Sequence, residues 1–304
     1  MNEVGAAEKR YAMAVQLLPE ELRQAAVRLA CSDQKAAEEF RLRRGQPLSV
    51  RLPEREQRLP TPSVTGKMLQ TVIDRATEFS AYRSAESIRR GYLPVRGGFR
   101  IGLCGTAVQR GGEIATLQEL SSVAIRIAKE VVGAAESLYP KLFWDGQFES
   151  VLLIAPPGGG KTTLLRDLIR CLSEGDEKHS GLRVSVVDER GEIAAVHGGE
   201  PQFQIGRQTD VLTAVSKAEG ISMLLRTMTP QVIAVDEITD PKDLQAMTEA
   251  ANCGVSFLAT VHGRNLAEIQ KRRLCCALLE TEVFHHCVIL ERREGKRQFR
   301  VETW

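Results

Sequence analysis

The chain has no long apolar run and no C-x-x-C pair of cysteines, and each absence argues against a class of protein. None of its segments approaches the roughly 20 apolar residues that a membrane-spanning helix needs. Its seven cysteines include no C-x-x-C pair, which leaves a zinc site with little support. Met1–Arg10 is polar and lacks the apolar centre of a signal peptide. We therefore expect a cytoplasmic protein with reduced thiols, associated with membrane complexes only peripherally, through partners.

An excess of one charge is also lacking. The chain has 41 basic and 39 acidic residues and a net charge of +2, which does not favour binding to nucleic acids or membranes through bulk electrostatics. Its 43% hydrophobic and 26% charged residues are typical of a soluble globular protein, and 304 residues can form one large domain or two modest ones. We expect no specific nucleic-acid partner.

What is present is a segment typical of nucleotide-binding proteins, Ala155-Pro-Pro-Gly-Gly-Gly-Lys-Thr162. It follows an apolar run at 151–154 and opens a stretch whose apolar residues repeat at helical spacing. A strand, a glycine-rich turn, Lys-Thr and a helix form the arrangement that binds phosphate groups. Glycine lets backbone N–H groups approach the phosphate oxygens, and the helix N-terminus favours negative charge. The alternative is a structural loop that happens to contain three glycines.

The side chains of this loop have expected roles. Lys161 is predicted to reach the β and γ phosphates, and the Thr162 hydroxyl to bind Mg²⁺. Ala155 stands where the pattern usually has its first glycine, and alanine is small enough for that position. The predicted phosphate-binding residues are Pro157, Gly158, Gly159, Gly160, Lys161, Thr162 and Thr163.

Two adjacent carboxylates follow a second apolar run, Val232–Val235. In a buried parallel strand, both would lie at the carboxyl end, beside the phosphate loop on an adjacent strand. Asp236 is predicted to hold Mg²⁺ through water, and Glu237 to orient or deprotonate the attacking water. A strand that ends in a solvated Asp-Glu pair is the alternative, and the presence of Lys161 favours the functional interpretation.

Polar groups also end two further apolar runs. Asp188 and Glu189 form an acidic box after one of them, and Thr260 and His262 lie at the end of the other. Either Thr260 or His262 could sense the γ-phosphate by hydrogen bonding, although a histidine at a strand end is more often structural.

Phosphoryl transfer also needs positive charge, commonly from an arginine. The candidates, each more often a surface or ion-pairing residue, are Arg207 and Arg226 in the C-terminal half and Arg96, Arg100 and Arg126 in the N-terminal half.

The first part of the chain mixes helical and strand patterns. The expected elements are helices within 8–45, a strand at 48–52, a connector at 53–62, a helix at 65–76 capped by Thr65, a small antiparallel sheet within 91–108, and a strand at 123–128 that leads into a helix.

From residue 150 onward, apolar strands alternate with helical segments, which indicates a parallel sheet covered by helices. The expected strands are 151–155, 183–187, 232–235 and 255–260, the expected helices are 161–173, 219–229 and 241–253, and a terminal hairpin is expected from 287–290 and 298–301. The chain is thus predicted to be an α/β protein. A smaller α+β N-terminal domain, 1–135, precedes a P-loop domain with a mostly parallel sheet, 136–304.

The order of these motifs resembles the secretion ATPase superfamily, which drives type II and type IV secretion and pilus assembly. The phosphate loop, the acidic box, the Asp236-Glu237 strand and the histidine segment follow one another as they do there. More specifically, the chain resembles the stage III sporulation protein AA family. That resemblance is carried by Gly97-Gly-Phe-Arg-Ile-Gly102, Pro156 to Asp167, Asp188-Glu-Arg-Gly-Glu192, Thr209 to Leu212, Lys217-Ala-Glu-Gly220 and Met228 to Ile238. The chain departs from the family pattern at Phe99 instead of histidine, at Gln208, which separates Arg207 from Thr209, and at Ser216 instead of proline.

The resemblance implies a RecA-like P-loop NTPase core and a magnesium-dependent ATPase that assembles into a homo-hexameric ring. It implies a role in the channel that links mother cell and forespore during endospore formation, with membrane proteins of that channel as partners. It also implies that an arginine of the N-terminal domain contacts nucleotide at a subunit interface, with Arg100 and Arg126 at the matching positions. ATP hydrolysis is then expected to move the N-terminal domain against the core.

Two other functions stay open at this point. One is a nucleotide-dependent oligomeric scaffold with little turnover. The other is a RecA-like nucleic-acid motor, which the near-neutral charge and the lack of an aromatic-basic groove pattern disfavour.

Overall fold

The computed structural model describes residues 3–77, 91–293 and 296–303. The chain divides into two compact units, Met1–Glu130 and Val131–Trp304, and each has its own hydrophobic core. Among the described residues, no helix combines the length and the apolar character needed to cross a membrane.

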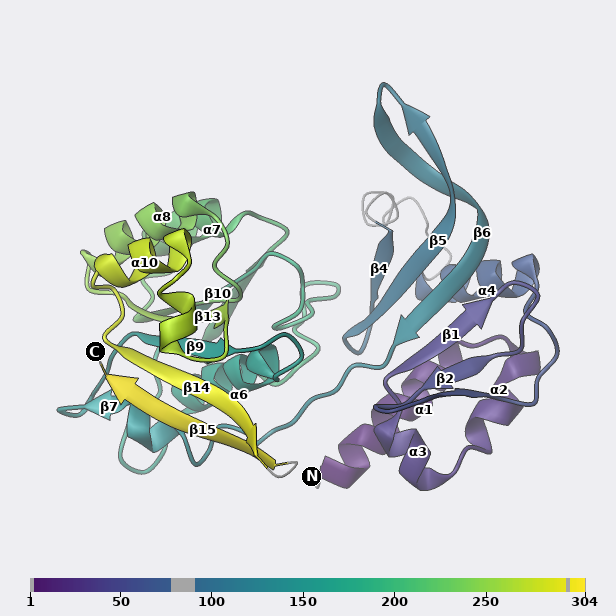
Figure 1. Cartoon of the computed structure of the whole chain (residues 1–304), viewed down its shortest axis with the longest axis horizontal. Helices are drawn as coiled ribbons and strands as arrows, with labels where there is room; N and C mark the ends of the chain where they lie inside the picture. The colour runs from purple at the N-terminus through teal and green to yellow at the C-terminus, as the bar shows by residue number, and fades with distance from the viewer. Residues whose placement is uncertain (1–2, 78–90, 294–295, 304) are drawn as a thin grey trace. The chain divides into compact units, whose positions relative to one another are not determined.

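The N-terminal unit is a six-stranded antiparallel sheet packed against helices (Figure 1). In the sheet order β3-β2-β1-β6-β5-β4, the strands are β3 Glu56–Arg58, β2 Ser49–Arg51, β1 Glu39–Arg43, β6 Glu113–Arg126, β5 Phe99–Arg110 and β4 Tyr92–Val95. The helices are α1 Glu3–Leu17, α2 Glu20–Val27, α3 Cys31–Ala36 and α4 Gly66–Ala76. Alternate residues of a strand point to opposite faces, and Phe40, Leu42, Ile101 and Ile125 place one face of the sheet in the core.

Several expectations for this part of the chain are corrected. Residues 39–43 form a strand instead of part of a helix, because Phe40 and Leu42 alternate with charged residues and are fully buried. The connector at 53–62 contains β3. The helix expected after residue 128 does not form: residues 132–138 are turns, which lead into the 3-10 helix η2 Tyr139–Leu142. The helix at 65–76 is confirmed as α4, and the Thr65 hydroxyl accepts from the Met68 N–H at 3.3 Å.

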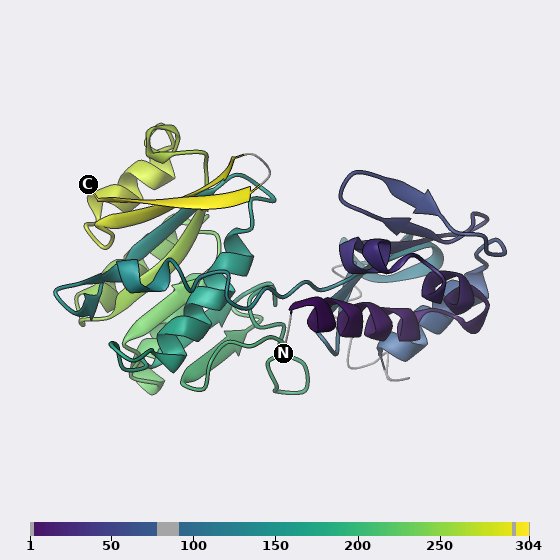
Figure 2. The same ribbon diagram turned by 90° about the horizontal axis from the view of Figure 1, so that it is seen from below.

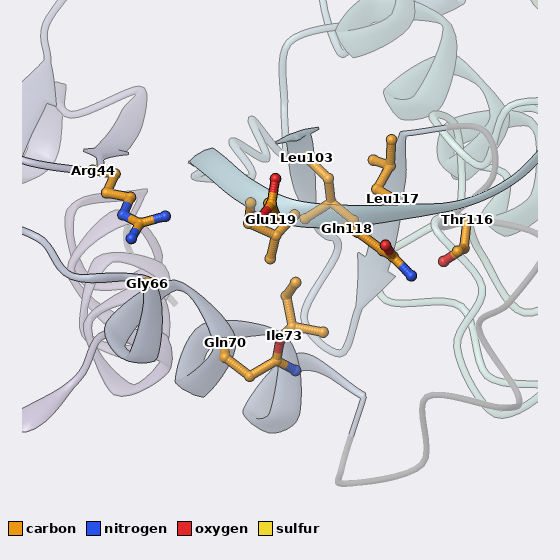
Figure 3. A pocket seen from close by; sticks show the side chains of 10 residues that line it. Arg44, Gly66, Gln70, Ile73, Leu103, Thr116, Leu117, Gln118 and Glu119 are labelled. Atoms are coloured by element: carbon orange, nitrogen blue, oxygen red, sulfur yellow. The ribbon is translucent and has the colours of Figure 1, made fainter. Parts of the chain in front are cut away.

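Strands β5 and β6 form a long hairpin with an interrupted ladder. The register shifts between Cys104 and Thr106, where residues 119–121 lie opposite Gly105. A Cβ atom at this glycine would lie 2.6 Å from the Gln118 carbonyl oxygen, so the close approach requires glycine. A pocket of about 420 Å³ lies beside this bulge (Figure 3), lined by residues that include Arg44, Gln70 and Ile73 on one side and Leu103 and Leu117 on the other.

The C-terminal unit is built on a seven-stranded sheet in the order β11-β10-β12-β13-β9-β14-β15. Its strands are β9 Val151–Ala155, β10 Val184–Asp188, β11 Thr209–Thr213, β12 Val232–Val235, β13 Ser256–His262, β14 His286–Arg293 and β15 Lys296–Thr303. Neighbouring strands are parallel except for β14 and β15, which form the expected terminal hairpin, yellow in Figures 1 and 2. Residues 294–295 of the predicted turn lie outside the described residues. A small separate hairpin consists of β7 Phe143–Trp144 and β8 Gln147–Phe148.

Helices cover both faces of this sheet (Figure 1). The helices are α6 Lys161–Glu174, α7 Lys217–Thr227, α8 Pro241–Ala251, α9 Leu266–Ile269 and α10 Arg273–Glu280. In β9, Val151 and Leu153 pack in one core cluster with α6, whereas Leu152 and Ile154 pack in the other with α7, α8 and α10. All five residues of β9 are therefore buried, as expected for a strand of a parallel sheet covered on both sides. The predicted α/β class is confirmed.

Candidate functional site

The glycine-rich loop joins β9 to α6, and its three glycines are needed for two reasons. Gly158 and Gly160 have φ values of 72° and 93°, the left-handed region that favours glycine. A Cβ atom on Gly159 would lie 2.9 Å from the Pro156 carbonyl oxygen and 3.0 Å from the Ala155 Cβ. The loop therefore turns tightly into the first turn of α6, where unpaired backbone N–H groups can face an anion.

Lys161, the first residue of α6, folds back over this loop. Its side chain is buried, and Nζ donates to the Ala155 carbonyl oxygen at 3.3 Å and to His262 Nδ1 at 2.6 Å. Burial lowers the pKa of the ammonium, and the negative charges of Asp236 and Glu237 oppose that shift. The predicted phosphate-binding lysine therefore lies against the predicted histidine and near both predicted acids.

Two threonines hold the carboxylate of Asp236. The Thr162 hydroxyl donates to Oδ2 at 2.7 Å, and the fully buried Thr260 hydroxyl donates to Oδ1 at 2.6 Å. A threonine hydroxyl and a carboxylate are hard oxygen donors, the type that Mg²⁺ prefers. The donor set at Thr162 and Asp236 therefore fits this ion.

Glu237 lies between two basic side chains. Its Oε1 accepts from His262 Nε2 at 2.8 Å, and its Oε2 pairs with Arg190 Nη1 at 3.3 Å. Its backbone has a φ of 46°, rare for a residue with a side chain, and its N–H donates to the Thr260 hydroxyl at 2.9 Å. Strained backbone of this kind persists only where surrounding contacts hold it, and it is common at functional sites.

Strand order explains how these groups meet. The phosphate loop and Asp236 were predicted to lie on adjacent strands, but β13 lies between β9 and β12. This insertion puts Thr260 and His262 in the middle of the site, because the carboxyl ends of parallel strands share one edge of the sheet. Thr260 contacts the acids on one side, and His262 joins Lys161 to Glu237.

The acidic box is divided between two roles. Asp188 is 2% exposed, and its carboxylate accepts N–H groups of the loop that follows it, from Glu192 at 2.8 Å, Ile193 at 3.1 Å and Ala194 at 2.8 Å. This carboxylate therefore holds the loop in shape. Glu189 is more exposed, and it accepts from the buried Lys217 Nζ at 2.5 Å.

The predicted arginines of the C-terminal half are not brought to the loop of their own chain. Arg207 pairs with Glu174 at 2.8 Å, at the last residue of α6. The 14 residues of this helix span about 20 Å, so Arg207 lies at the end far from Lys161. Arg226 lies in the last turn of α7, before β12 begins, and therefore near the amino edge of the sheet. Neither arginine therefore lies at the carboxyl edge that holds the phosphate loop.

Arg100 and Arg126 belong to the N-terminal unit, where they are register partners on β5 and β6. The Arg100 guanidinium lies 4.0 Å from the centre of the Tyr92 ring, and Arg126 Nε lies 3.7 Å from Glu39 Oε2. Both side chains stand on one face of the sheet, because residues paired across antiparallel strands point the same way.

Sequence reasoning missed Arg190 and Lys217 as members of the site. A small cavity is lined by both residues together with the acids Glu189, Asp236 and Glu237. The available signal was their position inside the motifs Asp188-Glu-Arg-Gly-Glu192 and Lys217-Ala-Glu-Gly220. Spacing alone could not show that these two motifs meet.

The chain is similar to known proteins over most of its length. The family described as "Sporulation stage III, protein AA" matches residues 8–301. The chain is 36% identical over 281 residues to "Stage III sporulation protein AA" of Bacillus subtilis (strain 168), which covers 92% of this chain and 91% of that protein.

Solved structures of ATPases share the fold. The Legionella pneumophila ATPase DotB is similar with a TM-score of 0.56 and 18% identity, over 88% of this chain and 76% of that one. The pilus retraction motor PilT with bound ADP is similar with a TM-score of 0.58 and 17% identity, over 88% of this chain and 79% of that one. The C-terminal unit therefore has the RecA-like fold of secretion ATPases, as predicted.

Proposed function

The chain belongs to the family of sporulation stage III protein AA, and on that premise we propose that it is a magnesium-dependent ATPase that drives the channel between mother cell and forespore. One observation carries the proposal: a continuous set of contacts joins Lys161, His262 and Glu237 at the sheet edge that also holds Thr162 and Asp236. A phosphate-loop lysine, a hydroxyl–carboxylate pair for Mg²⁺ and a second carboxylate are the parts that phosphoryl transfer to water requires.

Each side chain has a role in this mechanism. The loop N–H groups bind the phosphates of ATP, and the Lys161 ammonium moves from His262 onto the β and γ phosphate oxygens. Thr162 and Asp236 would hold Mg²⁺, Asp236 through water, and the ion would offset the phosphate charge. Glu237 accepts the proton of the attacking water, and its contact with His262 keeps the carboxylate near the lysine. Asp188 holds the loop after β10 in shape. Glu189 lines the small cavity that Asp236 and Glu237 also line.

Measured ATP turnover tests this site. Lys161→Ala is expected to abolish ATP binding, whereas Glu237→Gln is expected to retain binding and to lose at least about 100-fold in kcat, the usual contribution of a general base. The exposed Lys178→Ala and Glu177→Gln are matched controls and should behave like the wild type. If either site variant keeps wild-type turnover, the assignment is wrong.

A homo-hexameric ring is the second part of the proposal. ATP would bind between subunits, and Arg100 or Arg126 would contact nucleotide bound to the neighbouring copy. The particle mass with and without ATP and Mg²⁺ tests assembly, and a mass that stays that of one chain would contradict a ring driven by nucleotide.

Mixed rings test the arginines separately. Arg126→Ala and Glu237→Gln subunits, each inactive alone, should regain activity when mixed, because some interfaces then combine an intact Arg126 with an intact Glu237. The same experiment applies to Arg100→Ala. Absence of any recovery would place the arginine outside the interface.

In the cell, we place the protein at the cytoplasmic face of a membrane complex, held there by membrane proteins of the channel. The rival functions are outcomes of the same assays. Tight ATP binding and assembly without phosphate release would indicate a scaffold, and strong salt-dependent stimulation by DNA or RNA would indicate a nucleic-acid motor.

A further inference from the structure

The loop after β10 is fixed from both sides by buried charges. Asp188 accepts its backbone N–H groups, as described above, and the buried Arg166 donates to its carbonyl groups. Arg166 Nε lies 2.6 Å from the Ile193 oxygen, and Nη2 lies 2.7 Å from the Glu192 oxygen. The Arg166 guanidinium also stacks on the Phe203 ring at 3.7 Å. A loop held by this many buried polar contacts has a defined shape, so its outward side chains have defined positions.

Arg190 is the side chain that this loop directs to the end of β12. Its guanidinium Nη1 lies 3.3 Å from Glu237 Oε2, on the opposite side of the carboxylate from His262. Both carboxylate oxygens therefore have a basic partner, one from β13 and one from the loop after β10. Two partners fix the plane of a carboxylate, whereas one would leave it free to rotate.

The backbone of Glu237 makes such support necessary. Its φ of 46° is unfavourable for a residue with a Cβ atom. The Thr260 hydroxyl holds the Glu237 N–H, and Arg190 and His262 hold the carboxylate. Removal of one holder would let the strained residue relax and would displace its carboxylate from the phosphate loop.

The stability of the fold does not account for the ion pair between Arg190 and Glu237. The Arg190 side chain is 60% exposed, and an exposed ion pair adds little to stability. A surface arginine can nevertheless matter for a reaction, because a displacement of a reacting group by about 1 Å can lower a rate substantially.

We propose that Arg190 is a positioning residue that holds Glu237 in the orientation needed to activate water. This inference rests on the proposed ATPase function. Arg190 acts through Glu237 and not on the nucleotide, so its loss lowers the rate of hydrolysis and leaves ATP affinity unchanged.

The test compares Arg190→Gln, Arg190→Lys and the control Arg183→Gln in the full chain. Arg183 comes directly before β10, whereas Arg190 follows the opposite end of that strand. The Arg183 Nε donates to the Thr229 carbonyl oxygen. Arg190→Gln is expected to lower kcat about tenfold, the effect of a small loss of transition-state stabilisation, with the Kd for ATP and the thermal midpoint unchanged. Arg190→Lys should recover part of the rate, and Arg183→Gln should match the wild type.

A second background separates positioning from direct contact with phosphate. In Glu237→Asp the shortened carboxylate no longer reaches Arg190, so adding Arg190→Gln should change kcat by less than about twofold, as expected for coupled residues. An equal tenfold loss in both backgrounds would overturn the proposal, as would an unchanged kcat in Arg190→Gln alone. If the assembled wild type fails to hydrolyse ATP, the proposed function itself falls, and this proposal falls with it.

Discussion

Lys161 and His262 lie 101 positions apart in the chain, and their Nζ and Nδ1 atoms lie 2.6 Å apart. An ammonium can only donate, so Nδ1 of the imidazole accepts. The ring proton is then on Nε2, which donates to Glu237 Oε1 at 2.8 Å. In this state a neutral His262 connects the lysine that would bind phosphate to the carboxylate that would activate water.

This contact predicts opposite effects of His262→Ala on binding and on turnover. ATP must draw Lys161 away from His262, so the variant should bind ATP as tightly as the wild type or up to about fivefold more tightly. Its kcat should fall about tenfold or more, because Glu237 loses a hydrogen-bond donor. Titration with a fluorescent ATP analogue and steady-state turnover give the two values, with the exposed His285→Ala as control. Weaker binding together with normal turnover would contradict this interpretation.

Thr260 is predicted to matter for stability, because it holds both Asp236 and Glu237. Its hydroxyl is fully buried, donates to Asp236 and accepts from the Glu237 N–H. Thr260→Val would leave both partners unpaired and should lower the free energy of unfolding by about 1–3 kcal/mol. Thr260→Ser keeps the hydroxyl and should retain most of the stability. Urea unfolding of the nucleotide-free protein measures both, and equal midpoints for the two variants would exclude the hydrogen bonds as the cause.

Asp188→Asn is expected to disrupt the acidic-box loop. Both carboxylate oxygens accept backbone N–H groups, and an asparagine NH₂ group would face these donors instead. We expect a loss of at least about 2 kcal/mol in unfolding free energy. Asp210→Asn, at an exposed position on the neighbouring β11, is the control and should change little. Faster proteolysis within 189–194 in Asp188→Asn would support the assignment, and a normal urea midpoint would count against it.

The free energy of unfolding is predicted to fall in alkaline solution, because two cysteine thiols and one tyrosine hydroxyl are buried. Burial raises the pKa of Cys171 from 9.0 to about 11, and it raises those of Cys287 and Tyr139 to about 12. The unfolded thiols lose their protons near pH 9 while the folded protein keeps them. The stabilisation is therefore complete below pH 9 and is lost as the pH rises towards 11–12.

Urea midpoints at pH 7.5 and 10 measure this loss. The double variant Cys171→Ala, Cys287→Ala should show a smaller decrease between the two values, whereas the exposed Cys31→Ala should show the wild-type decrease. An unchanged pH dependence in the double variant would rule out the thiols as its source.

Contiguous patterns were predicted well from the sequence. The strands at 151–155 and 232–235 and the helix from Lys161 were identified because burial on both faces requires continuous apolar runs, and because glycine-rich loops have few alternatives. Residues 39–43 were missed, since a short strand beside charged helices is locally ambiguous and was decided by burial of Phe40 and Leu42.

The arginines show where sequence reasoning fails. Arg207 and Arg226 have motif positions as suggestive as that of Arg190, yet they lie towards the amino edge of the sheet while Arg190 reaches Glu237. Which arginine meets a carboxylate depends on the direction of each strand and on the shape of the loop that follows it. Neither property can be inferred from residue spacing.

The residue pattern alone predicted the polar groups at the ends of four strands: the glycine-rich loop with Lys161, the acids at 188 and 236–237, and the histidine at 262. Which of these groups touch became clear from the folded chain. Insertion of β13 between β9 and β12 brought Thr260 against Asp236 and His262 between Lys161 and Glu237. Backbone groups pair equally well with any parallel neighbour, so the crossover connections and the packing of helices decide the order of the strands. Contacts at the carboxyl edge follow that order and not the order of the chain.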